Sequence, residues 1–116
     1  MMMRLNIHGH SIFLNRELRQ HIERRIRHAT RRFESRIRLT SVLLSDVNGP
    51  KGGADKVCRV IVELNRRDRV VLTGLGSDAF RLVDGVADRV NWRISLLVQR
   101  RRRFDRTRTI RRKARL

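Results

Sequence analysis

Arginine is the residue type in this sequence that offers the most functional chemistry, and that chemistry is the binding of anions. The chain holds 29 Lys and Arg against 11 Asp and Glu, which gives a formal net charge of +18 over 116 residues. This excess predicts a polyanionic partner, either a nucleic acid or an acidic membrane. Aromatic residues make up only 4% and tyrosine is absent, so we expect recognition of folded RNA by shape and phosphate rather than base stacking.

The positive charge gathers in two places. A predicted helix, with Asn15 as its N-cap and its end at about Phe33, carries a basic flank that includes Arg24, Arg25, Arg31 and Arg32. Residues 100–116 contain ten basic residues and one acidic residue, which is half of the net charge. A basic helix flank can also be an ordinary solvated surface, but the net charge of the whole chain favours RNA contact through phosphates.

Residues that could catalyse a reaction or hold a metal ion do not form a recognisable set. The four histidines lack paired cysteines and lack the His-Glu-x-x-His pattern of zinc sites: His8, His10, His21 and His28. Asp84 and Asp88 could mimic a catalytic carboxylate pair, but we expect them to orient nearby arginines or to stabilise the first half of their helix through its dipole. The sequence predicts no enzyme, catalytic residue, metal, cofactor or small-molecule substrate.

The only cysteine, Cys58, lies on the apolar face of a predicted strand, where an inert buried thiol is expected. A single cysteine allows no disulfide within the chain and fits the reducing cytoplasm. We find no apolar run typical of a signal peptide or a transmembrane helix, and we expect no membrane partner. Met1, Met2 and Met3 are candidates for the start of the chain.

A long helix is predicted from Ser77 to about Arg103, with Asp78 as its N-cap. Its apolar residues recur at steps of three and four and should cover one side: Phe80, Val83, Val86, Ala87, Val90, Ile94, Leu97 and Val98. Trp92 lies opposite this stripe. It is either covered incidentally by the tail or a loop, or it contacts a partner.

Four strands complete the predicted domain, at 4–9, 37–47, 57–65 and 69–75. The order β-α-β-β-β-α predicts an α+β fold, with a right-handed parallel crossover followed by an antiparallel meander. Both helices should pack on one face of the four-stranded mixed sheet. We expect one domain over residues 3–99 and a flexible basic tail over 100–116. The loop from Asn48 to Asp55 is either a plain hairpin or a phosphate contact through Lys51 and Lys56; it lacks the Walker A spacing.

Four segments in the same order resemble the ribosome hibernation-promoting factors, also called ribosome-associated translation inhibitors. The likeness covers about Met3 to Leu97. The segments are Met3-Arg-Leu-Asn-Ile-His-Gly9, Arg32-Phe-Glu-Ser-Arg-Ile37, Ser77-Asp-Ala-Phe-Arg-Leu-Val-Asp-Gly-Val-Ala-Asp-Arg89, and Ser45-Asp-Val-Asn-Gly-Pro-Lys-Gly-Gly-Ala-Asp55 followed by Cys58. The last segment is similar to the hairpin of a short subgroup. The family's fold is β-α-β-β-β-α, the order that the residue patterns predict on their own.

The resemblance implies binding to the small ribosomal subunit and its rRNA, in the decoding region where tRNA and mRNA would sit. It implies RNA contacts by basic helix residues, which in this chain would be Arg24, Arg25, Arg31, Arg32, Arg89 and Arg93, with Arg100, Arg101, Arg102, Arg103 and Lys51 added from their charge. The sequence departs from the family at Leu96, Leu97 and Val98, where basic residues are expected. The second domain of the long form is also missing, so the effect on ribosome pairing stays open. We expect a monomer when the protein is free. The first alternative is a general double-stranded RNA-binding or nucleic-acid-binding protein. The second, of another class, is an RNA-processing enzyme.

Overall fold

The computed structural model describes residues 3–47 and 55–114, and the backbone alone of Arg66. The predicted contact Lys51 therefore lies outside the described residues. The elements follow in the order β1 (Arg4–His10), α1 (Arg16–Thr30), the 3-10 helix η1 (Arg31–Arg36), β2 (Ile37–Asp46), β3 (Lys56–Leu64), the 3-10 turn η3 (Asn65–Arg67), β4 (Arg69–Gly76) and α2 (Ala79–Ala114). The predicted order β-α-β-β-β-α is confirmed.

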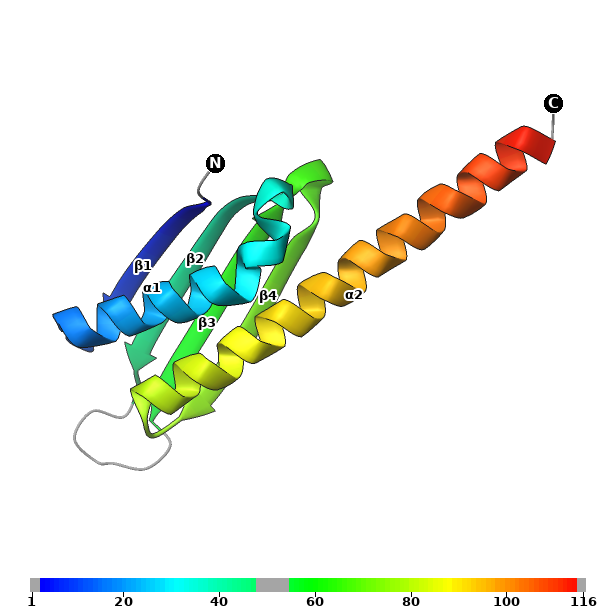
Figure 1. Ribbon diagram of the computed structural model, residues 1–116. Helices are drawn as coiled ribbons and strands as arrows, with labels where there is room; N and C mark the ends of the chain where they lie inside the picture. The colour runs from blue at the N-terminus through cyan, green and yellow to red at the C-terminus, as the bar shows by residue number, and fades with distance from the viewer. Residues whose placement is uncertain (1–2, 48–54, 115–116) are drawn as a thin grey trace.

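The sheet has the strand order β1-β2-β3-β4. β1 runs parallel to β2, while β2, β3 and β4 pair antiparallel, as predicted. Both helices cover the same face of the sheet (Figure 1). The core lies between these layers, where Ile22 and Ile26 of α1 and Val90 and Ile94 of α2 are at most 1% exposed.

Both predicted helix caps are present. Asn15 Oδ1 accepts a hydrogen bond of 2.8 Å from the backbone N–H of Leu18 at the start of α1. Asp78 Oδ1 accepts from the N–H groups of Phe80 and Arg81, at 2.9 and 3.3 Å. These caps satisfy amides that have no partner within the first helical turn.

One residue was wrongly assigned to the predicted apolar stripe, and one was omitted from it. Phe80 is 40% exposed, and Leu82, which the stripe omitted, is 8% exposed. Leu82 reaches the sheet because β4 has a glycine there: a Cβ on Gly74 would lie 2.6 Å from Val86 Cγ2 and 3.0 Å from Leu82 Cδ1. Gly74 therefore permits the close approach of α2 to β4.

The predicted end of the long helix near Arg103 is wrong, because α2 continues to Ala114. Arginine is a good helix former, and basic residues in a last turn interact favourably with the helix dipole. The C-terminal part of α2 projects beyond the sheet (Figure 1) and extends the molecule to 67 Å in its longest dimension. We call residues Gln99–Ala114 the arm. None of the helices in the described ranges has an apolar stretch that could span a membrane.

Candidate nucleic-acid interface

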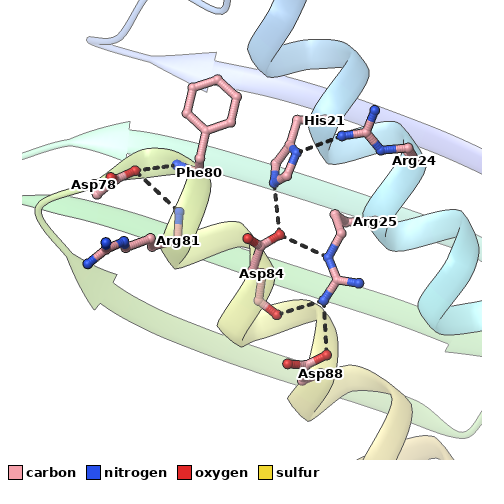
Figure 2. A network of polar contacts seen from close by, with 8 residues as sticks. All are labelled: His21, Arg24, Arg25, Asp78, Phe80, Arg81, Asp84 and Asp88. Carbon is pink, nitrogen blue, oxygen red and sulfur yellow. Dashed lines mark hydrogen bonds and ion pairs between the residues drawn. The ribbon is translucent and has the colours of Figure 1, made fainter.

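A polar cluster joins α1 to α2 at the surface of the helix layer (Figure 2). Asp84 Oδ1 accepts from His21 Nε2 at 2.8 Å and from Arg25 Nε at 2.9 Å. Arg25 Nη2 also donates to the Asp84 backbone carbonyl at 3.3 Å and to Asp88 Oδ1 at 2.9 Å. The expectation that the two aspartates orient an arginine is confirmed, and the guanidinium of Arg25 is held by both carboxylates.

His21 connects this cluster to its neighbours. Its ring lies 5.0 Å from the Phe80 ring, and Arg24 Nη2 lies 3.2 Å from His21 Nδ1. Since an arginine can only donate, Nδ1 is the acceptor in this contact, and Nε2 carries the proton that faces Asp84. That proton is donated to Asp84. The side chain of Arg24 is thereby placed on the outer surface beside the cluster.

The remaining predicted residues of the first group lie at the end of α1 and in η1. Arg31 and Arg32 are exposed. Arg32 lies 5.1 Å from the centre of the Phe33 ring and donates to Ser95 Oγ of α2 at 3.1 Å. No described residue pairs with Arg31. The structure therefore brings Arg24, Arg25 and Arg32 to the boundary between the two helices, with Arg31 next to it.

The opposite flank of α2 carries the second group. Arg89 Nη1 donates to the Thr73 carbonyl of β4 at 3.2 Å. Arg93 and Arg100 line a cleft of about 290 Å³ together with Arg69 at the start of β4. The predicted residues of α2 thus form a row along the edge of the sheet, separate from the arginines at the α1–α2 boundary.

Sequence reasoning missed two arginines at a larger basic cleft. This cleft has a volume of about 710 Å³ and is lined by Arg4 and Arg38 as well as by Arg31 and Arg32. Arg4 pairs with Leu39 in the parallel register of β1 and β2, which places it beside Arg38. The predicted parallel crossover already implied that the starts of these two strands lie together, and that signal could have identified both residues.

Arg101 differs from its neighbours in the basic run at 100–103. Its Nε and Nη2 atoms donate to Asp68 Oδ2 and Oδ1, both at 2.9 Å. This paired hydrogen bond and the charge of Asp68 raise the pKa of Arg101 above its ordinary value. Arg102 and Arg103 are exposed. The Asp68–Arg101 pair joins the first turn of the arm to the connection between β3 and β4.

The cysteine, histidine and acidic side chains of the described residues are the groups that could form reactive or metal-binding arrangements. Burial raises the pKa of the Cys58 thiol to about 11, so this cysteine is protonated and unreactive at neutral pH, as expected. Within residues 3–47 and 55–114, no group of three or more His, Cys, Asp or Glu side chains could hold a metal ion. Trp92, whose role the sequence left open, is 62% exposed on the outer side of α2.

Comparison with known proteins supports the fold. The chain is similar to a ribosomal subunit interface protein from Coxiella burnetii, with a TM-score of 0.71 and 15% identity over 84% of this chain and 99% of that one. It is also similar to the Protein Y N-terminal domain of Thermus thermophilus, with a TM-score of 0.66 and 18% identity over the same shares.

No family model and no curated protein matches the sequence. At these identities the likeness to the two solved structures shows a common fold. The predicted α+β fold is therefore confirmed.

Proposed function

We propose that this protein is a ribosome-associated hibernation factor that inhibits translation by binding the small ribosomal subunit. The observation that carries the proposal is a fold shared with a ribosomal subunit interface protein, presented by a chain with a net charge of +18. The protein would bind phosphates of the rRNA in the decoding region and occupy the path of tRNA and mRNA. Occlusion needs no catalysis and no cofactor, because it is reversed when the protein dissociates.

The exposed arginines at the α1–α2 boundary are the contacts we assign to this function. The packed fold fixes the backbone positions of Arg24, Arg31 and Arg32, so these residues can select one arrangement of phosphates over another. Arg25 is bound by Asp84 and Asp88, and we assign it to positioning the two helices as well as to contacting RNA. Arg89, Arg93 and Arg100 would extend the contact along the other flank of α2.

We further propose that the free protein is a cytoplasmic monomer that acts in stationary phase or under stress. Sedimentation of stationary-phase lysate with antibody detection tests this setting. The protein should comigrate with small subunits or whole ribosomes. Migration with DNA or with free RNA would instead support a general nucleic-acid-binding protein.

Competition for the decoding region tests the occlusion mechanism directly. The purified protein should inhibit cell-free translation and should displace initiator tRNA from isolated small subunits. The measurement is the occupancy of labelled initiator tRNA as the protein is titrated. Simultaneous full occupancy by both molecules would show that the protein binds elsewhere.

A charge-matched pair of variants separates a selective site from general attraction. Replacing Arg24, Arg31 and Arg32 by Gln removes three charges from the proposed site, while replacing Arg16, Arg19 and Arg59 by Gln removes three exposed charges elsewhere. The first variant should lose its preference for small subunits over bulk double-stranded RNA. The second should keep that preference. Equal losses would favour the general nucleic-acid-binding protein.

A further inference from the structure

The side chains of the arm are almost all outside the protein core. From Gln99 to Ala114 every residue is exposed except Arg101, which is half-buried against Asp68. The arm has sixteen residues, so it is about 24 Å long at the α-helical rise per residue. Nine of those residues are basic and one, Asp105, is acidic. A helix with this composition suits a partner that supplies negative charge.

The charges surround the arm rather than lying along one face. Residues of an α-helix point about 100° apart around the axis, so the four consecutive arginines from Arg100 to Arg103 cover its whole circumference. Further along, Arg108 and Arg111 share a side with Arg100. The opposite side is formed by Arg102, Arg106 and Lys113. A partner that touched only one side would leave the other set of cations facing solvent.

The same arrangement argues against a protein or membrane partner. Docking into a protein groove or on a bilayer requires an apolar stripe along one face of the helix. The large apolar residues of the arm are Phe104 and Ile110, both exposed. They are six positions apart, which places them about 120° apart around the axis and on no common face. Phosphate is the ligand chemistry that suits arginines on every side.

The direction of the arm is set at its base. The two hydrogen bonds from Arg101 to Asp68 join the arm to the connection between β3 and β4. Phe104 lines a small hollow of about 230 Å³ with Leu97, Arg100 and Arg101, all of them residues of α2 itself. The arm therefore leaves the domain at a defined angle, and its position relative to the α1–α2 boundary is determined before any partner binds.

We propose that the arm enters a cleft of folded RNA that has phosphates on opposing walls, and that the Asp68–Arg101 pair directs it there. This inference rests on the proposed function, in which the RNA is that of the small ribosomal subunit. It adds a second binding element to the arginines of the helix layer. In the cleft, repulsion between arginines four residues apart, such as Arg102 and Arg106, is replaced by attraction to phosphate.

Two variants of equal charge test whether RNA surrounds the arm. One replaces Arg100, Arg108 and Arg111 by Gln on one side, and the other replaces Arg102, Arg106 and Lys113 by Gln on the opposite side. Glutamine keeps the helix propensity close to that of arginine, and circular dichroism of each variant confirms the helix. The measurement is the affinity for purified small subunits over a range of salt concentrations.

Both variants should bind more weakly than the wild type, and each should lower the slope of log affinity against log salt by about 2 to 3, since three phosphate contacts are lost. A change in only one variant would show that the arm lies on a single surface and would overturn the proposal. A change in neither would show that the arm does not contact RNA. If wild-type protein binds no subunits, the proposed function fails and this inference fails with it. Loss of binding in the Arg24, Arg31 and Arg32 variant alone overturns only the inference.

Discussion

The two halves of α2 meet different surroundings and carry different charges. Between residues 78 and 98, three acidic residues balance three basic ones, and Val83, Val86, Val90 and Ile94 are buried against the sheet. Between residues 99 and 114, nine basic residues face one acidic residue, and almost every side chain is exposed. The half that packs is neutral, and the half that projects carries a large share of the excess charge. Burial against the sheet and most of the excess positive charge thus fall on successive parts of one helix.

The largest expected effect on stability comes from placing a carboxylate in the buried half of α2 rather than on the exposed arm. Val90 is 0% exposed, so Val90→Asp would bury a carboxylate without a partner and should lower the free energy of unfolding by several kcal/mol. Arg106→Asp introduces the same group on the exposed arm and should change stability by no more than about 0.5 kcal/mol. Urea unfolding of both variants measures the difference. Similar losses would mean that the arm packs against the domain.

The sequence predicted the packed half of α2 well, because burial leaves a periodic pattern. The spacing of Val83, Val90 and Ile94 identified the buried face, and Asp78 identified the first turn. Phe80 was assigned to the core because a pattern of apolar residues does not show that His21 of another helix offers an alternative contact. Leu82 was missed because its place depends on Gly74 of β4.

The helical arm and part of the candidate site could not be predicted from a periodic pattern of apolar residues. Arginines on all sides leave no periodic signal, and a run of charge is equally typical of a flexible tail. Helix propensity was the only available evidence that α2 continues beyond Arg103. The cleft at Arg4 and Arg38 depends on a pairing between strands that are more than thirty residues apart. Such sites follow from topology, so they become visible once the strand order is known.

A smaller effect is expected at the boundary between α1 and α2. Asp84→Ala removes the acceptor of His21 and Arg25 and should lower the free energy of unfolding by about 1–2 kcal/mol, since the carboxylate is partly exposed. Asp105→Ala is the matched change on the arm and should have less effect. A double-mutant cycle with Arg25→Ala should show coupling at Asp84. Additive losses would mean that the cluster holds the helices only weakly.

The buried core should also make a contribution to the pH dependence of stability, through the thiol of Cys58. Burial raises the pKa of Cys58 from 9.0 in its ordinary state to about 11. Above pH 9 the unfolded chain loses the thiol proton while the folded protein keeps it, so this group favours unfolding as pH rises from 9 to 11. At pH 10 the loss should be about 1 kcal/mol, which corresponds to roughly one pKa unit.

Comparison with Cys58→Ala isolates this contribution, because other groups also titrate in this range. The difference between the unfolding free energies of the two proteins should change between pH 8 and pH 10. A constant difference would mean that the thiol titrates equally in the folded and unfolded states.

The smallest effect on stability, and the sharpest test of the arm, is expected at Asp68. Asp68→Asn keeps the shape of the side chain but removes its charge and one of the two oxygens that accept hydrogen bonds from Arg101. The domain should stay folded, because its core lies elsewhere, while the arm should lose its defined direction. Glu23→Gln is the matched control, since it also removes one carboxylate that pairs with an arginine, Arg27, at 3.2 Å.

Spin labels on cysteines introduced at Thr109 of the arm and at Arg59 on the open face of the sheet report this direction. The protonated, buried Cys58 leaves the two introduced cysteines as the reactive sites. The distance distribution between the labels should be narrow in the parent and in Glu23→Gln, and should broaden in Asp68→Asn. If Asp68→Asn leaves the distribution narrow, helix continuity alone directs the arm. The Asp68–Arg101 pair would then contribute nothing to how the projecting half of α2 is presented to RNA.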